Sequence, residues 1–276
     1  MPDRENSVNL IHYDILKDVK HCFTTRTGGV SEGACASLNM SFSREPSSEN
    51  VRENYRRVAS AMDVDFCKMT RVPQLHTDHV LNITEDLVGI GISKPFPEGM
   101  EKYGYDAMIT NVPGAVLCTV HADCVPVFLY DEKAGAIGVV HSGWRSTALK
   151  ISAKTVKMME DALGADPSRM KAVIGPSISQ DAFETDSDVY EAMKAAFGNL
   201  TEDKTLVYRC GSKYKISVSG FVYHTLIEAG VRDENIYRDA RCTYTDRDLF
   251  FSHRRDKSQR WDMGNTGAMS AVISLR

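Results

Sequence analysis

The 276-residue sequence lacks any continuous apolar segment near the roughly 20 residues that a membrane-spanning helix needs. Its opening residues, MPDRENSVNL, are polar and have no apolar core of the kind found in a secretory signal peptide. A basic tract is also absent, and the formal net charge of −4 offers no electrostatic footprint for nucleic acid. We therefore expect a cytoplasmic protein that binds neither membranes nor nucleic acid.

The cysteines lack the pattern of a disulfide framework. There are seven of them, an odd number, scattered along the chain without a CxxC pair. This usage is typical of a reducing compartment. No internal repeat, low-complexity tract or Pro/Ser-rich linker divides the chain, and 42% of its residues are hydrophobic. The composition and patterning predict a single mixed α/β domain over residues 1–276.

The most informative stretch that is present covers residues 114–149. Three apolar runs in it are bounded by turn residues and predict three strands, at residues 115–120, 125–130 and 136–140. Beyond them, apolar residues recur at helical spacing and predict one helix that stops at Gly164. The apolar positions of this helix are Leu149, Ala153, Val156, Met159 and Leu163.

A hairpin within this stretch would bring a thiol and an imidazole together. If residues 131–134 form a four-residue loop, Tyr130 pairs with Gly135 and Cys124 falls directly opposite His141. Opposed residues share a face, with Cα atoms roughly 4.5–5.5 Å apart. Such a pair suits either a metal with nitrogen and sulfur ligands or a nucleophile with its base.

Polar residues gather around the same strand ends. Ser142 and Gly143 would lie at a strand-to-helix elbow, where free backbone N–H groups can hold an anion. Asp123, His121 and Arg145 crowd the same ends and are candidates for substrate contacts or for orienting a metal ligand.

Two other segments offer partners for this site. His76 and His79 lie in residues 69–83, and either could be a third metal ligand; His76 directly follows a strand-like run and is better placed. Arg26 stands beside a Gly-Gly turn, and its guanidinium has the donor geometry that matches phosphate.

Five motifs in this order resemble those of the bacterial YfiH/laccase-domain family, first called polyphenol oxidases. They are TTRTGGVSEG with SLNM, then PQLH, TVHADCVPVFLYDEKAGAIGVVHSGWR, IGPSIS and CTYTDRDLFFSHRRD. Members of that family are described as zinc-dependent purine nucleoside phosphorylases, with adenosine deaminase and methylthioadenosine phosphorylase activities. The resemblance implies an α/β fold with two packed mixed or antiparallel sheets flanked by helices.

The resemblance also implies a site. His76, Cys124 and His141 match the family's metal ligands and would be the catalytic centre, with Zn²⁺ as cofactor and copper as the alternative metal. Two histidines and one cysteine leave one coordination position open, as in catalytic zinc sites.

The implied substrates are inorganic phosphate and a purine nucleoside such as adenosine, inosine, guanosine or methylthioadenosine. Candidates for contacting them are Arg26, Ser142, Gly143, Arg145 and Asp123. For deamination, a water activated by the metal would attack C6 of the purine. The oligomeric state is not indicated by the sequence.

Three positions depart from the family pattern. Thr77 stands where glycine is frequent, Phe183 where tyrosine is usual and Ala268 where arginine is common. None of them is a presumed metal ligand, so they bear on substrate preference.

Other functions stay open at this point. A metal-free cysteine hydrolase, for instance an amidase for cell-wall peptide intermediates, would use Cys124 as nucleophile and His141 as base, but would leave His76 without a role. A copper oxidoreductase could use the same three ligands, yet the eight histidines are too widely spread for a multicopper cluster. A non-enzymatic module stabilised by zinc would need a fourth protein ligand.

Overall fold

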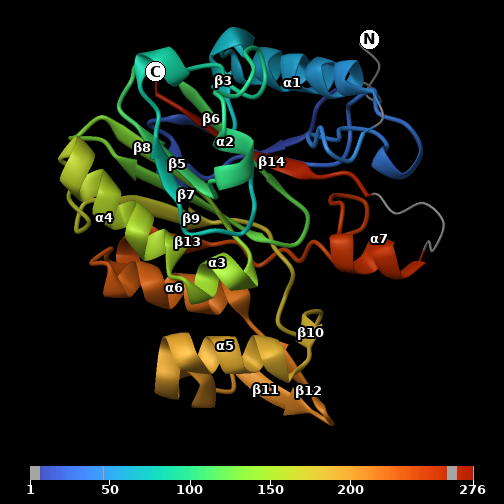
Figure 1. Ribbon diagram of the computed structural model, residues 1–276, viewed down its shortest axis with the longest axis vertical. Helices are drawn as coiled ribbons and strands as arrows, with labels where there is room; N and C mark the ends of the chain where they lie inside the picture. The colour runs from blue at the N-terminus through green and yellow to red at the C-terminus, as the bar shows by residue number, and fades with distance from the viewer. Residues whose placement is uncertain (1–6, 46, 260–265, 276) are drawn as a thin grey trace.

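The computed structural model describes residues 7–45, 47–259 and 266–275. Two large sheets pack face to face, and helices cover both outer faces (Figure 1). This confirms the expected mixed α/β fold with packed sheets flanked by helices. The extent of the domain, residues 1–276, stays a prediction.

The first sheet has five strands in the order β1-β2-β14-β6-β3. They are β1 (Leu10–Ile11), β2 (Lys20–Thr24), β14 (Met269–Ser274), β6 (Val116–His121) and β3 (Met69–Thr70). β14, near the C-terminus, lies antiparallel between β2 and β6, whereas β3 runs parallel to β6. Segments distant in the sequence thus share this sheet.

The second sheet has six strands in the order β13-β9-β7-β8-β5-β4. They are β13 (Ile236–Arg238), β9 (Lys171–Ile174), β7 (Val125–Asp131), β8 (Ala136–Ser142), β5 (Ala107–Thr110) and β4 (Val80–Asn82). β7 and β8 form the central antiparallel hairpin, and every residue of both strands is buried. Continuous apolar runs of this kind are expected for strands covered on both faces.

Alternate residues of the hairpin enter different cores. Phe128 and Val139 face the first sheet, where they pack with Phe23 and Ile273. Val127 and its neighbours face the helices on the other side. This alternation follows from the two-residue period of a strand.

Seven α-helices surround the sheets within the described residues. They are α1 (Ser48–Met62), α2 (Met100–Tyr103), α3 (Trp144–Ala148), α4 (Ile151–Leu163), α5 (Ser187–Phe197), α6 (Val218–Glu228) and α7 (His253–Gln259). α1 packs on the five-stranded sheet, and its first turn is capped by the Ser47 hydroxyl, which accepts a hydrogen bond from the Asn50 N–H. α4 and α6 pack on the six-stranded sheet. None of these helices is both long and apolar enough to cross a bilayer.

A third, smaller sheet was not expected. It contains β10 (Glu184–Thr185), β12 (Lys213–Ile216) and β11 (Val207–Cys210), and lies with α5 at one end of the long axis (Figure 1). Its core includes Phe221 of α6 and Met193 of α5. This unit contributes Phe183, just before β10, to the cavity described below.

The register of the central hairpin corrects one prediction. Tyr130 pairs with Ile137 rather than Gly135, because Asp131 continues the strand and pairs with Ala136. Gly135, with φ of 57°, belongs to the turn. The resulting shift of two residues keeps the same side chains on each face. Cys124, which directly precedes β7, therefore lies diagonal to His141 rather than directly opposite it.

The predicted helix after His141 is also corrected. It is broken into α3 and α4 at Leu149–Lys150, where Lys150 adopts a left-handed φ of 58°. The side chain of Leu149 is 47% exposed and so lies outside the apolar face. The predicted stop is confirmed, because Gly164 caps α4 with φ of 68°.

Candidate metal centre and surrounding cavity

Three segments bring the predicted metal ligands together. His76 lies in the loop between β3 and β4, Cys124 in the turn between β6 and β7, and His141 near the end of β8. His76 Nε2 lies 3.8 Å from Cys124 Sγ, and one ligand atom from each residue lies within 4.8 Å of the other two. Across the described residues, this is the one group of three or more such side chains.

These distances suit a metal ion. Zinc bonds of about 2.3 Å to sulfur and about 2.0 Å to nitrogen, at a tetrahedral angle, separate the two ligand atoms by about 3.5 Å. The 3.8 Å between His76 and Cys124 is close to that value. Two imidazoles and a thiolate are donors that both zinc and copper accept.

His79 does not join this group. Its ring stacks on Tyr103, with centroids 4.1 Å apart, and its Nδ1 lies 3.0 Å from the Gly104 carbonyl. Of the two candidate histidines, it is His76 that approaches Cys124 and His141.

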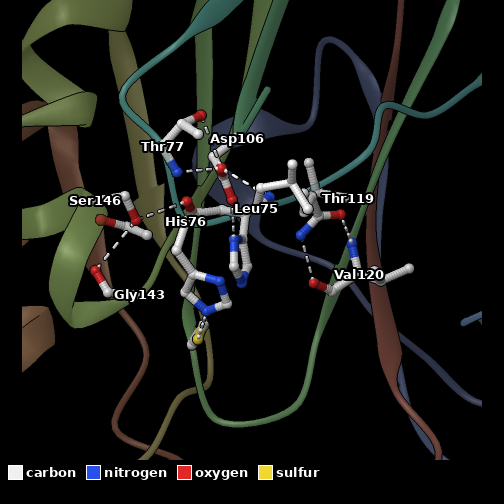
Figure 2. Close-up of polar contacts among 12 residues, drawn as sticks. Leu75, His76, Thr77, Asp106, Thr119, Val120, Gly143 and Ser146 are labelled. Carbon is white, nitrogen blue, oxygen red and sulfur yellow. Dashed lines mark hydrogen bonds and ion pairs between the residues drawn. The ribbon is translucent and has the colours of Figure 1, made fainter. Parts of the chain in front are cut away.

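A buried carboxylate orients both histidines. Asp106 directly precedes β5, and its Oδ1 accepts a 2.7 Å hydrogen bond from His141 Nδ1. Its Oδ2 accepts bonds from the N–H groups of Leu75 and Thr77, at 3.2 and 2.6 Å, and from the Thr77 hydroxyl at 3.0 Å (Figure 2). With Nδ1 donating to Asp106, His141 directs Nε2 toward the cysteine.

These bonds hold an unusual backbone conformation. His76 has φ of 61°, a left-handed value uncommon for residues other than glycine. The residues on either side of it are both anchored on Asp106. Burial opposes ionisation of Asp106, but hydrogen bonds from His141 and Thr77 outweigh it and lower the pKa of the carboxyl.

Gln74 attaches the same loop to the first sheet. Its amide nitrogen donates to the Val120 carbonyl and its amide oxygen accepts from the Val120 N–H, each at 2.8 Å (Figure 2). Val120 lies on β6, four residues before Cys124. The side chain therefore fixes the loop that carries His76 relative to the strand that leads to Cys124.

Gly143 permits the close approach of the ligands. A Cβ atom at this position would lie 2.6 Å from His76 Cδ2 and 3.2 Å from Cys124 Sγ. The backbone of Gly143, with φ of −77° and ψ of 171°, is accessible to any residue. Glycine is thus required here by space rather than by conformation.

The cysteine and its histidine are electrostatically coupled. Burial opposes the thiolate, but the charge of His141 and hydrogen bonds from His141 and His76 lower the pKa of Cys124 to about 6. Burial also opposes the imidazolium, but the Cys124 thiolate and Asp106 raise the pKa of His141 to about 10. Without a metal ion, the pair therefore favours thiolate and imidazolium.

His121 supports Cys124 without belonging to the ligand group. Its Nδ1 lies 3.2 Å from the Cys124 carbonyl and its Nε2 lies 2.8 Å from the Thr119 hydroxyl. Burial, together with the nearby His141, lowers the pKa of His121 well below its ordinary value, so the ring is neutral.

A cavity of about 460 Å³ opens beside the three ligands. Three arginines line it: Arg44, Arg145 and Arg254. Two aromatic side chains, Trp144 and Phe183, line it as well, and the Arg145 and Arg254 guanidinium groups lie over them at 4.1 and 5.0 Å from the ring centroids. The arrangement offers a cationic and aromatic surface next to a metal-binding group.

Of the two arginines predicted to contact substrate, only one lines the cavity. Arg145 lines the cavity, whereas Arg26 does not: its guanidinium donates to the Ala36 and Arg247 carbonyls and lies 4.6 Å from the centroid of Phe251. Sequence reasoning missed Arg44, the arginine of this region that does line the cavity.

The remaining candidates already have protein partners. Ser142 is fully buried, and its hydroxyl lies 2.7 Å from that of Thr147. Asp123 lines the cavity, but its oxygens accept hydrogen bonds from the Thr243 hydroxyl and the Arg254 N–H, both at 2.7 Å. Contacts of these residues, Gly143 and Arg26 with substrate stay predictions.

Comparison with known proteins identifies the family. Residues 20–276 match the family model described as multi-copper polyphenol oxidoreductase laccase. The chain belongs to this laccase family. The resemblance found in the sequence motifs is thereby confirmed.

Curated relatives of this laccase-family chain carry an enzymatic name. A purine nucleoside phosphorylase of Deinococcus radiodurans is 36% identical over 93% of the chain and 89% of its own length. Purine nucleoside phosphorylase YlmD of Bacillus subtilis is 30% identical over 94% of the chain and 90% of its own length.

A solved structure of the family has the same fold. The Bacillus licheniformis hypothetical protein YfiH superposes with a TM-score of 0.87 at 30% identity, covering 99% of this chain and 98% of that one. The three departures from the family motifs can now be placed. Thr77 binds Asp106, whereas Phe183 and Ala268 line the cavity.

Proposed function

We propose that the chain is a zinc-dependent purine nucleoside phosphorylase that acts on adenosine, inosine, guanosine and methylthioadenosine. The observation that carries this proposal is the cationic, aromatic cavity that opens onto the group of His76, Cys124 and His141. The names of the relatives support an enzyme of this kind.

The donor set supports zinc. Two imidazole nitrogens and a thiolate would hold the ion, with Asp106 orienting His141. When bound, Zn²⁺ supplies a Lewis acid with one position open beyond the three protein ligands. Copper accepts the same donors, so metal analysis of the purified protein decides between them.

Phosphorolysis assigns roles to the residues around the metal group. A phosphate oxygen bonds to the anomeric carbon while the bond from that carbon to the purine nitrogen breaks. The products are the free base and ribose 1-phosphate, or 5-methylthioribose 1-phosphate when methylthioadenosine is the substrate. The Trp144 and Phe183 rings offer apolar surface to the base. The positively charged side chains of the lining hold the phosphate and offset its negative charge.

The decisive assay measures phosphate-dependent release of base from a panel of nucleosides, with metal content determined on the same sample. We expect base release that requires phosphate and scales with zinc content. Release that is independent of phosphate would contradict the proposal. Conversion of adenosine to inosine in the same reactions tests the additional adenosine deaminase activity that the family resemblance implies and that we include in the proposal.

The lowered pKa of Cys124 favours a second candidate, the metal-free cysteine hydrolase, with an amide of a cell-wall peptide intermediate as substrate. The position of His76, 3.8 Å from the sulfur, disfavours it, because a nucleophile–base pair needs no second imidazole there. Hydrolysis that persists after chelation and stops on thiol alkylation would support this alternative.

A cytoplasmic location stays a prediction.

A further inference from the structure

Arg44 lies in a part of the cavity wall to which no role has been assigned above. It belongs to the segment between β2 and α1 and lines the cavity together with Ser41 and Ser43. Its Nη1 donates to the carbonyls of Thr266 and Gly267, at 3.3 and 3.2 Å. Among the described residues, its Nε and Nη2 meet no hydrogen-bond acceptor, and no carboxylate lies within ion-pair distance.

A guanidinium in such surroundings needs an anion. Burial lowers the pKa of Arg44, since charge is costly away from water, while the nearby Cys124 and Asp123 raise it. Arginines withdrawn from water are normally paired with carboxylate or phosphate. Asp123 forms no ion pair with Arg44, and its two oxygens accept hydrogen bonds from the Thr243 hydroxyl and the Arg254 N–H.

The segment that carries Arg44 is held in place before any ligand binds. Asn39 is fully buried; its side-chain oxygen accepts from the N–H groups of Ser41 and Ala268, both at 3.0 Å, and its amide nitrogen donates to the Ser41 carbonyl at 3.1 Å. The Ser41 and Ser43 hydroxyls lie 3.1 Å apart. The Asn39 side-chain amide therefore positions both the segment that carries the serine hydroxyls and Ala268, which directly precedes β14.

We propose that Ser41, Ser43 and Arg44 form a binding site for a tetrahedral oxyanion, which is free inorganic phosphate if the function proposed above is correct. The unpaired N–H groups of the guanidinium bind two phosphate oxygens side by side, and the serine hydroxyls donate to the others. This assigns the phosphate to Arg44, inside the cavity, instead of Arg26 outside it.

The other two cavity arginines differ from Arg44 in their surroundings. The Arg254 guanidinium donates to the Glu184 carbonyl at 2.6 Å and lies over Phe183. Arg145 is exposed and lies over Trp144. Both are therefore associated with the aromatic part of the lining, whereas Arg44 is accompanied by hydroxyl groups.

The first test is calorimetric titration of the purified, metal-loaded protein with inorganic phosphate. We expect Arg44→Gln to weaken phosphate binding by about tenfold or more. Arg44→Lys should weaken it less, because lysine keeps the positive charge but lacks the two parallel N–H donors of the guanidinium. Arg209→Gln, at an exposed position of strand β11, is the matched control and should bind like the wild type.

Two further variants keep the test decisive. Ser43 is exposed, so Ser43→Ala is expected to fold and to weaken phosphate binding severalfold even if Arg44→Gln does not fold. Arg26→Lys is expected to bind phosphate like the wild type. Wild-type affinity in both Arg44 variants and in Ser43→Ala, or a loss in Arg26→Lys alone, would overturn the assignment.

The source of the phosphate group is tested with adenosine 5′-monophosphate in the same calorimeter. If Arg44→Gln weakened binding of the nucleotide but not of inorganic phosphate, Arg44 would serve a phosphate ester and the assignment to free phosphate would be wrong. We expect inorganic phosphate to be affected.

Kinetics separate this inference from the proposed function. In the phosphorolysis assay, Arg44→Gln should raise KM for phosphate about tenfold and leave KM for the nucleoside nearly unchanged. An unchanged KM for phosphate would reject the site while the function stands. Phosphate binding through Arg44 without any release of base would reject the function while the site stands.

Discussion

The two histidines of the metal group are positioned by different means. His141 lies near the end of β8, in a buried antiparallel ladder whose register fixes it. His76 lies in an irregular loop with a left-handed backbone, and side chains from distant segments hold it through Asp106 and Gln74. We infer that His141, on β8, and Cys124, directly before β7, keep their geometry through the sheet, whereas His76, in the loop, depends on a few hydrogen bonds.

The largest effect on metal binding and activity is expected at Gly143, where the end of β8 meets the loop that carries His76. In Gly143→Ala the new Cβ would collide with His76 Cδ2 at 2.6 Å and crowd Cys124 Sγ at 3.2 Å. Because the loop yields more easily than the ladder, we expect His76 to be displaced and both metal binding and activity to be nearly abolished. Metal analysis and the phosphorolysis assay measure these losses.

Two controls accompany this variant. Cys124→Ala gives the reference level for complete loss of the site. The backbone angles of Gly143 suit alanine, so thermal unfolding monitored by circular dichroism should show a retained fold. Full metal content and wild-type turnover in Gly143→Ala would show that the close packing of the three ligands is not needed.

A smaller effect on metal binding is expected from Asp106→Asn, which alters the contacts of Asp106 both with His141 and with the loop that carries His76. Asparagine can keep one acceptor for His141 but then places an NH₂ group against three donors from Leu75 and Thr77. We expect metal affinity to fall by about 10–100-fold, as for other residues that orient a metal-bound histidine. Competition with a chromophoric chelator measures the affinity.

The matched variant for the loop alone is Gln74→Glu. It keeps the acceptor for the Val120 N–H and loses the donor to the Val120 carbonyl, without touching His141. We expect a smaller loss of metal affinity than in Asp106→Asn. Equal losses in the two variants would mean that orientation of His141 contributes nothing and that the loop alone determines affinity.

The pair of Cys124 and His141 can be examined through the ionisation of Cys124. Because its pKa is lowered to about 6, the thiolate is present above that pH and is lost as the pH falls through it. At pH 7 most of this thiol is ionised, against a few per cent for an ordinary cysteine, so its thiolate is roughly 30-fold more abundant. Because a less basic thiolate is also less nucleophilic, we expect alkylation of metal-depleted protein to be severalfold faster. Mass spectrometry of iodoacetamide-treated samples between pH 4.5 and 9 measures the rate.

Internal controls are available for this measurement. Cys67 and Cys210 are exposed thiols in the same molecule, and their alkylation rates provide the reference for cysteines outside the site. Restoring zinc should protect Cys124 and leave these two unchanged. An alkylation midpoint for Cys124 near pH 8.5 would show that the imidazole does not stabilise its thiolate.

The same contrast explains what could be predicted from the sequence. The three central strands follow directly from apolar runs bounded by turn residues, and the end of α4 at Gly164 follows from local chemistry. The hairpin register was missed by two residues, since the sequence alone does not reveal that Asp131 extends the strand. Local sequence patterns are therefore enough to predict the strands and helices, but not the exact register in which the strands pair.

The loop-borne half of the site was less accessible to sequence reasoning. The choice of His76 over His79 came from family motifs, and nothing local marks Asp106, because its partners lie about 30 residues away on either side. The choice of Arg26 followed a local turn signal, and no local signal pointed to Arg44. Which arginine lines the cavity depends on the packing of β14 against β2, a contact between the two ends of the chain.

The smallest effect, and the finest test of the contrast, is expected from Thr77→Val. The substitution removes the hydroxyl that donates to Asp106 at 3.0 Å but keeps the backbone N–H at 2.6 Å, so three of the four bonds to the carboxylate persist. A hydrogen bond to a charged group contributes about 1.5–3 kcal/mol, and partial replacement by water should limit the loss to about 1 kcal/mol, or about fivefold in metal affinity. Chelator competition, with Thr77→Ser as the control that keeps the hydroxyl, measures this loss. If Thr77→Val matched Asp106→Asn, the left-handed loop would depend on a single hydroxyl, and the backbone bonds would not hold it as inferred here.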